Sequence, residues 1–275
     1  MNYCYLNDKI VPLDKAFVHI EDIGLLRGYS VFDLLRTFHG KPFLLQEHVQ
    51  RLRNSAKALS LLVPYTNKEI AEIVDKLLKK NEAKDVKIRI LLTGGNAING
   101  IGFDPHKPTF AILIEPIHPF PEDLYTKGGK LITTIHLRHE FASKTTNYIN
   151  AIALASERKK RKAVEVLYVY DNHALECSTS NFFIFKHNTL ITPKNNILIG
   201  TTRNFVLHLV SKDFTIEERD IELNELQVAD EAFITSTTKN VLPIVQIDEM
   251  RIGNGMVGPN TKEIMKKFAD YVKKL

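Results

Sequence analysis

Apolar residues recur at helical spacing in two segments of the N-terminal part. The first segment predicts an amphipathic helix, because its apolar residues follow a period of 3.6 positions: Val49, Leu52, Ala56, Leu59 and Val63. The second helix begins at residues 66–69, where a threonine and a glutamate three positions later form a capping box. Its apolar positions are Ile70, Ile73, Val74, Leu77 and Leu78.

Short apolar runs predict the strands. In the N-terminal part they span residues 86–93 and 110–115. In the C-terminal part they span residues 131–136, 165–170, 181–185, 232–235 and 242–247, with helices predicted over residues 147–158, 203–210 and 261–273. The irregular alternation of strands and helices favours an α+β fold over a doubly wound parallel sheet.

Three prolines separate the two parts of the chain, at positions 116, 119 and 121. Proline is excluded from helix interiors and from central strands, so this segment reads as a linker. We therefore expect a small N-terminal α+β domain over residues 1–120 and a larger C-terminal domain over residues 121–275.

Composition narrows the class of protein. Two cysteines in 275 residues exclude a disulfide framework and favour a reducing, cytoplasmic setting. No apolar run reaches the roughly 18 residues of a membrane span, and the start of the chain lacks the pattern of a secretory signal. The net charge is a modest +5, and the basic run 158–162 fits the solvated end of a helix better than a nucleic-acid patch. The ten histidines lack metal-binding spacing, so no metal is expected.

Two segments have the composition of phosphate-binding sites. In residues 197–203 the apolar run 197–199 predicts a strand, and Gly200, Thr201 and Thr202 then lead into a helix. The free N–H groups at the start of this helix would attract a dianion. The alternative is that Thr202 only caps that helix. Residues 235–238 are four consecutive hydroxyl residues at the end of a strand, which suit an anion site or merely an exposed strand end. The glycines between residues 94 and 102 do not open a helix, so they are not a dinucleotide loop.

Three charged residues are candidates for chemistry, each with a plainer alternative. Arg51 lies in a polar stripe with His48 and Ser55 and could clamp a phosphate, or could be an ordinary exposed helix residue. Lys144 precedes a predicted helix whose positive end would lower the pKa of its amine, as imine chemistry requires, or could be an ordinary lysine among many. Glu176 precedes a run of small hydroxyl residues, where it could be a buried carboxylate or a turn residue.

These pieces follow one another in a recognisable order. His48-x-x-Arg51-Leu52 precedes Lys144-x-x-Asn147-Tyr148, which precedes Glu176-x-Ser178-x-Ser180-Asn181, the segment 200–203 and the segment 235–237. In this order the chain resembles the class IV, fold-type IV pyridoxal-phosphate enzymes from about residue 22 to residue 261. That family holds branched-chain and D-amino-acid aminotransferases, some amine transaminases and aminodeoxychorismate lyase.

The resemblance implies a role for each matching residue. Lys144 would form the aldimine with the cofactor and then move the substrate proton, while Glu176 would face the pyridine nitrogen. Tyr148 would bind the phenolic oxygen of the cofactor. Arg51, Thr201, Thr202 and Thr237 would hold the phosphate. The remaining cofactor-binding residues would be Leu198, Gly200 and Ser236. The resemblance also implies a two-domain α+β fold of the D-amino-acid aminotransferase type, with pyridoxal 5′-phosphate between the domains, and a homodimer.

The substrate pocket departs from the family pattern. The loop 94–102 lacks the arginine and histidine with which D-amino-acid enzymes bind the substrate carboxylate. Arg27 is the nearest replacement cation, although a surface role suits it equally. Tyr29, Phe32 and Thr179 are further candidates for contact with the substrate.

The resemblance implies an aminotransferase that uses an amino donor and a 2-oxo acid. A lyase of the aminodeoxychorismate lyase type is the alternative, and a non-catalytic relative is a third reading. Tyr148 favours the aminotransferase over the lyase, and the joint presence of Lys144, Glu176 and Arg51 argues against loss of catalysis. Neither nucleic acid nor a membrane is expected as a partner.

Overall fold

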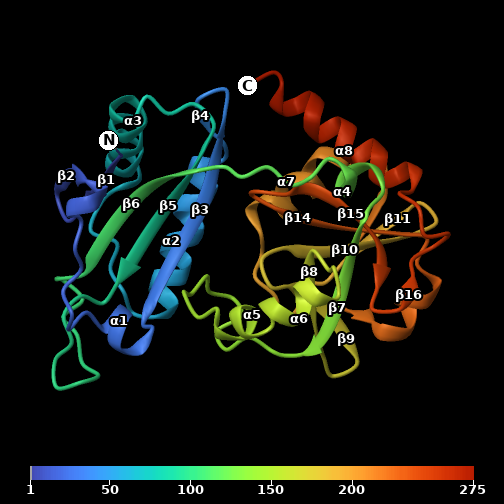
Figure 1. Ribbon diagram of the computed structural model, residues 1–275, viewed down its shortest axis with the longest axis horizontal. Coiled ribbons are helices and arrows are strands. Elements are labelled where there is room, and N and C mark those ends of the chain that lie inside the picture. Colours follow the sequence, from blue (N-terminus) through green and yellow to red (C-terminus); the bar gives the residue numbers. More distant parts are fainter. Residues whose placement is uncertain (1) are drawn as a thin grey trace. The chain divides into compact units, whose positions relative to one another are not determined.

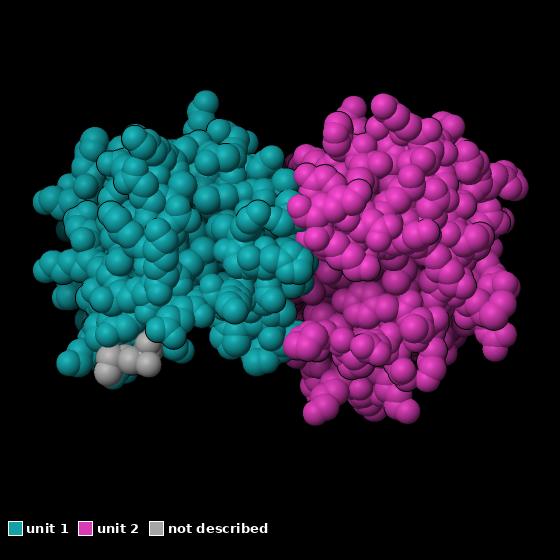
Figure 2. Space-filling view, turned by 90° about the horizontal axis from the view of Figure 1, so that it is seen from above, with its two compact units in different colours: residues 1–118, 143–147, 275 teal, residues 119–142, 148–274 magenta. Residues whose placement is uncertain are grey.

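The computed structural model describes residues 2–275, and the chain divides into two compact units (Figure 2). Unit 1 comprises the chain up to His118 together with residues 143–147 and Leu275. Unit 2 comprises residues 119–142 and 148–274. The segment 143–147, which a division at residue 120 assigns to the C-terminal part, therefore belongs to unit 1. Lys144 lies in this segment.

Unit 1 is an antiparallel six-stranded sheet with the strand order β2-β1-β6-β5-β3-β4 (Figure 1). Its strands are β1 (Tyr3–Leu6), β2 (Lys9–Pro12), β3 (Ser30–Phe38), β4 (Lys41–Pro42), β5 (Val86–Thr93) and β6 (Thr109–Pro116). Its helices are α1 (Ile23–Arg27), α2 (Leu45–Ala58) and α3 (Asn67–Lys80), with a short 3-10 turn at Leu13–Lys15. Alternate residues of β3 and β5, such as Leu35 and Ile90, share one buried core with α2 and α3.

Both helices predicted in the N-terminal part are confirmed. Thr66 and Glu69 form the expected capping box of α3, with the Glu69 carboxylate accepting a hydrogen bond from the Thr66 amide at 2.7 Å. Helix α2 is shorter than the apolar period predicts. It ends at Ala58, because Ser60 takes a left-handed conformation (φ 53°) and turns the chain before Val63.

Unit 2 is built around a closed barrel. Strands β10, β14, β15, β7, β8 and β9 pair in this order, and pairing of β9 with β10 closes the ring. The strands of the unit are β7 (Gly129–Ile135), β8 (Glu165–Tyr170), β9 (His173–Cys177), β10 (Asn181–Lys186), β11 (Thr189–Thr192), β12 (Thr215–Glu218), β13 (Ile221–Glu222), β14 (Glu231–Ser236), β15 (Asn240–Ile247) and β16 (Met250–Arg251). Its helices are α4 (Asp123–Thr126), α5 (Ile149–Ala153), α6 (Ala155–Lys160), α7 (Thr201–Val210) and α8 (Pro259–Val272), with a 3-10 helix at Leu223–Val228.

The two faces of each barrel strand have different environments. Phe182, Ile184 and Ile234 belong to the buried cluster that includes alternate residues of the other barrel strands, so they point inward. By the same alternation Asn181 and Thr235 point outward. The polar residues that match the family motif thus lie on the outer face of the barrel.

Two predicted elements of unit 2 are corrected by the structure. The helix predicted over 147–158 is broken into α5 and α6 and begins at Ile149. The strand predicted over 197–199 is an irregular segment, whose backbone is bound by side chains instead of by a neighbouring strand. Within residues 2–275 no helix is long and apolar enough to cross a membrane.

Candidate active site

Three polar residues form a row on the outer face of the unit 2 barrel. Glu176 pairs with Asn181 across β9 and β10, and Asn181 pairs with Thr235 across β10 and β14. Side chains of directly paired residues in antiparallel strands lie on the same face, a few ångströms apart. The register therefore brings together residues from two motifs that are about sixty positions apart in the chain.

Glu176 is a buried carboxylate rather than a turn residue, being only 6% exposed. Its Oε1 atom accepts hydrogen bonds from Arg138 Nε at 2.8 Å and from the Leu198 amide at 3.1 Å. Arg138 also donates to the carbonyl of Phe141 at 2.6 Å. The guanidinium thus balances the charge of a carboxylate that would otherwise be costly to bury.

The segment that follows Leu198 forms the first phosphate-binding candidate. Asn181 Nδ2 donates to the Leu198 carbonyl at 2.7 Å, which holds the chain beside the row of polar residues. A side chain at Gly200 would place its Cβ 2.0 Å from Asn181 Oδ1, so only glycine allows this approach. Gly200 is the N-cap of α7 and provides no side-chain cap. The reading in which Thr202 caps the helix is therefore wrong, and Thr201 and Thr202 lie in its first turn.

The second hydroxyl segment lies next to the first. Thr235 is the outward-facing partner of Asn181, and its hydroxyl is buried without a hydrogen-bond partner anywhere in residues 2–275. Ser236 ends β14, and its hydroxyl accepts a hydrogen bond from the Lys239 amide at 3.2 Å, which shapes the turn that carries Thr237. The four hydroxyl residues are thus not merely an exposed strand end.

In unit 1, a buried ionic cluster holds the arginine that the sequence singles out. Asp33 is fully buried and accepts two hydrogen bonds from Arg51, Nε and one terminal nitrogen each lying 2.8 Å from a carboxylate oxygen. His48 Nδ1 lies 2.6 Å from Asp33 Oδ1. Arg51 is 14% exposed, so it is not an ordinary surface residue.

The alternation of side chains along β3 explains why a charged residue, Asp33, is buried in the core of unit 1. Asp33 lies between Val31 and Leu35 on the face of β3 that packs against α2, where His48 and Arg51 point toward it. Burial opposes ionisation of Asp33, but Arg51 and His48 outweigh it and hold the pKa of this carboxyl well below its usual range. Burial, with the positive charges of Arg51 and Lys144, lowers the pKa of His48 despite the nearby Asp33.

Lys144 lies on an extended segment that pairs with the edge of β3. Its carbonyl accepts from the Phe32 amide at 2.9 Å, and its amide donates to Ser55 Oγ at 3.0 Å. Thr145 forms a bridge with Val31 in the same antiparallel arrangement. The Lys144 ammonium lies 4.8 Å from the centre of the Phe32 ring. The polar stripe of α2 thus serves two purposes, since Arg51 binds Asp33 and Ser55 anchors Lys144.

The substrate candidates of unit 1 differ in exposure. Arg27 is exposed at the end of α1, and its guanidinium approaches Gly100 of the glycine-rich loop. Tyr29 donates its hydroxyl to the Leu59 carbonyl at 2.6 Å and packs against Phe103. Phe32 is buried beside Lys144. Whether these residues bind substrate stays a prediction.

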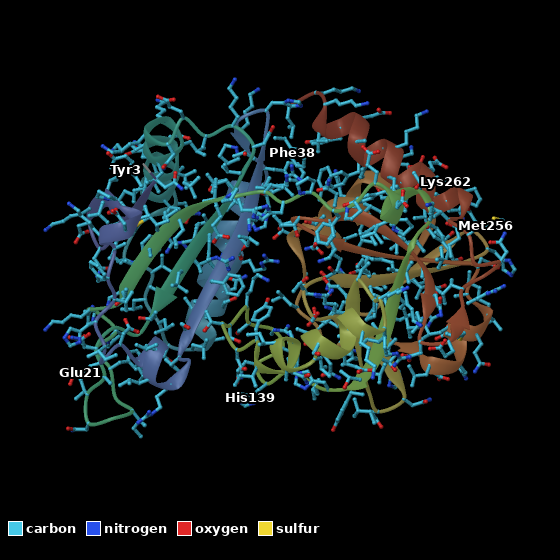
Figure 3. All side chains as sticks on the ribbon, in the orientation of Figure 1. Tyr3, Glu21, Phe38, His139, Met256 and Lys262 are labelled. Atoms are coloured by element: carbon cyan, nitrogen blue, oxygen red, sulfur yellow. The ribbon has the colours of Figure 1, made fainter. Side chains whose placement is uncertain are left out.

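In unit 2, Tyr148 is half-buried at the start of α5. Thr179 is exposed, although its hydroxyl already donates to Glu165 and accepts from Lys239. Their contact with cofactor and substrate likewise stays a prediction. Figure 3 shows the side chains on the ribbon, with Phe38 at the end of β3 and His139 next to Arg138 in the chain.

Sequence reasoning did not single out Asp33, Arg138, Glu165 or Lys239. Asp33 was detectable as the one acidic residue inside the apolar run 31–35. The other three carry no local signal, because their partners Glu176 and Thr179 come from distant parts of the chain.

Comparison with known proteins finds relatives that match almost the whole chain. Residues 30–247 match the family described as Amino-transferase class IV. A Methanocaldococcus jannaschii protein named "Putative branched-chain-amino-acid aminotransferase" is 34% identical over 97% of this chain and 95% of its own length. The D-alanine aminotransferase of Listeria monocytogenes is 30% identical over 97% of this chain and 95% of its own length. A solved branched-chain amino acid aminotransferase with pyridoxamine 5′-phosphate, from the organism abbreviated T.th., superimposes with a TM-score of 0.91 at 25% identity, covering 98% of this chain and 94% of that chain.

Proposed function

This chain belongs to the class IV aminotransferase family, and from that premise we propose that it uses pyridoxal 5′-phosphate to move an amino group from an amino acid or amine to a 2-oxo acid. The observation that carries the proposal is the row Glu176, Asn181 and Thr235, which joins a buried carboxylate to two phosphate-binding segments on one face of the barrel.

The residues of unit 2 fit this cofactor. Its phosphate suits the first turn of α7, where the N–H groups lack a side-chain cap. The glycine at the start of this helix lets the chain lie against Asn181. The buried Thr235 hydroxyl, which has no partner within residues 2–275, lies on the same face of the barrel. Glu176 offers a carboxylate for a protonated pyridine nitrogen, and Leu198, Gly200, Thr201, Thr202, Ser236 and Thr237 remain the proposed lining.

Pyridoxal phosphate, when bound, supplies an aldehyde that accepts the amino group and a ring that withdraws electrons. Lys144 would hold and move the proton at the substrate α-carbon. Its backbone is bound on both sides, by Ser55 and by Phe32, so its side chain starts from a defined place. We assign Arg51 to the phosphate and Tyr148 to the phenolic oxygen on the family pattern. Asp33 would then hold Arg51 in position.

We further propose a cytoplasmic homodimer. Phe17, Val18, Ile20 and Ile98 line one cleft of about 1100 Å³ in unit 1 and are between 47% and 79% exposed. Exposed apolar side chains gathered in one place are a feature of surfaces that bind another chain. The two free buried cysteines suit a reducing compartment.

The experiment that tests this function is a half-reaction assay on the purified protein. We expect the protein with added pyridoxal phosphate to be yellow, and L- or D-amino acids or amines to bleach its visible band. Borohydride reduction followed by peptide mapping should place the cofactor on Lys144. Lys144→Ala should lower turnover by at least roughly 10³-fold, as expected on loss of a general base. The matched control Lys262→Ala, an exposed lysine of α8, should not change turnover.

Two results would contradict the proposal. A protein that takes up no pyridoxal phosphate would refute the cofactor. A protein that releases pyruvate from aminodeoxychorismate, without transferring an amino group to any 2-oxo acid, would be a lyase instead.

A further inference from the structure

A buried ion pair lies at the end of the barrel that carries two turns rich in hydroxyl residues, 178–180 and 236–239. Glu165 begins β8 and is 3% exposed, and Lys239 lies in the turn between β14 and β15 and is 4% exposed. The Lys239 ammonium contacts Glu165 Oε1 directly. The Phe120 ring, 5.1 Å from the ammonium, helps to shield it from water.

Glu165 binds every residue of the turn between β9 and β10. Its Oε2 atom accepts from the Thr179 amide at 3.0 Å and from Ser178 Oγ at 3.2 Å. Its Oε1 atom accepts from Ser180 Oγ at 2.9 Å and from the Thr179 hydroxyl. The turn that connects Glu176 to Asn181 is therefore organised around one carboxylate.

Lys239 binds the same centre from the other turn. It donates from Nζ to Thr179 Oγ1 at 2.9 Å, while its backbone is held by Ser236 through the amide and by Tyr125 through the carbonyl. Thr237 lies two positions before Lys239 in this turn. The ion pair thus joins the turn after Glu176 to the turn that carries Thr237.

The energetics of a buried ion pair suggest a reason other than stability. Desolvation of two charges offsets most of their attraction, so a buried pair is often no more stable than apolar residues of the same size. A pair with this many hydrogen bonds does fix geometry, because both turns must satisfy one carboxylate.

We propose that Glu165 and Lys239 form a clamp that holds the turns 178–180 and 236–239 at one separation, and so positions the outer face of the barrel for an anionic phosphate group. The clamp residues are positioning residues, since they act through Thr179 and Thr237. This inference rests on the proposed function for the identity of the anion, but not for the coupling between the turns.

The coupling is tested by amide hydrogen exchange on the protein without cofactor. Glu165 is paired with the side chain of Lys239 in the turn 236–239, so Glu165→Gln should speed exchange at the amides of residues 237–239. Lys239→Met should in turn speed exchange at the Thr179 amide. We expect increases of roughly tenfold or more, as for local opening of a turn. The control Lys267→Met, on α8, breaks an ion pair with Asp213 and should change neither turn.

The positioning role is tested on the double variant Glu165→Gln/Lys239→Met. This variant removes both charges and should fold, whereas either single change leaves one buried charge unpaired. We expect its affinity for pyridoxal phosphate, and for inorganic phosphate measured separately, to fall by about tenfold with the thermal midpoint retained. The variant Lys239→Arg, in which Glu165 is retained, keeps the positive charge. It should therefore bind phosphate more tightly than the double variant does.

Each result decides the proposal. Independent exchange in the two turns would overturn the clamp, and so would a folded double variant that binds phosphate as the wild type does. Failure of the wild type to bind pyridoxal phosphate would refute the proposed function alone, because exchange and inorganic phosphate still test the clamp.

Discussion

Replacement of Asp33 by asparagine should reveal how strongly the buried cluster of unit 1 depends on one carboxylate. Asp33 is fully buried and is the counter-ion of a guanidinium that is only 14% exposed. Asparagine keeps the shape, but its amide group points an N–H donor toward the donors of Arg51 and His48. The variant therefore leaves a cation buried without its charge partner.

The expected loss follows from the burial of both groups. Removing one partner of a buried ion pair costs about 3–5 kcal/mol, and the one acceptor that asparagine retains places the value near the lower end. A loss of about 3 kcal/mol would lower the thermal midpoint of a chain of this size by roughly 6–12 °C. The control Asp213→Asn breaks a half-exposed pair with Lys267 and should cost less than about 1 kcal/mol.

The pH dependence gives a second, independent check. The pKa of Asp33 is lowered in the folded chain, so its contribution to stability is present above the unfolded value of about 3.9 and is lost only as the pH falls toward the folded value. The gap between wild type and Asp33→Asn should therefore persist from pH 7 to about pH 4 and narrow below it. Thermal unfolding followed by circular dichroism measures both quantities.

Two outcomes would refute this reasoning. A loss no larger than that of Asp213→Asn would show that Arg51 does not need its counter-ion. A gap that already closes between pH 7 and pH 5 would show that the pKa of Asp33 is not lowered.

Two further predictions concern the site itself. Glu176→Gln should retain the fold and the borohydride-trapped cofactor but slow the half-reaction by roughly 10²-fold or more, because a neutral amide cannot balance a protonated pyridine nitrogen. Rapid-scan absorbance measures the rate of the half-reaction, and an unchanged rate would remove Glu176 from the mechanism. Arg27→Ala should raise the KM for amino acids about tenfold or more and leave the KM for simple amines unchanged, because only amino acids carry a carboxylate. Equal changes of KM for both kinds of substrate in steady-state assays would show that Arg27 does not bind the substrate carboxylate.

Local signals in the sequence predict the regular elements well. The capping box at Thr66 and Glu69 and the strand Val86–Thr93 are found where they were expected, because their side chains satisfy nearby partners or one flat face. Local signals of this kind do not predict strand β3. Asp33 interrupts its apolar pattern, and only His48 and Arg51 of α2 make its burial acceptable.

The candidate site is harder to predict because its contacts are long-range. The order of motifs indicates that Glu176 and Lys144 matter, but not that Arg138 binds Glu176 or that Ser55 binds the Lys144 amide. The segment 197–199 has the composition of a strand and yet forms none, since Glu176 and Asn181 take up its hydrogen bonds. Whether such a segment forms a strand depends on which side chains from distant parts of the chain bind its backbone.

The return of residues 143–147 to unit 1 has a consequence for how the chain folds. Ser30 and Thr146 touch although 116 positions separate them, so the contact closes a loop that contains the entry into unit 2. A ribosome must synthesise more than half of the chain before the edge of β3 receives its last partner. Until then that edge presents unpaired N–H and C=O groups, which invite pairing with other chains. A fragment cut at the proline-rich linker would keep this open edge permanently and should aggregate, however complete its own core.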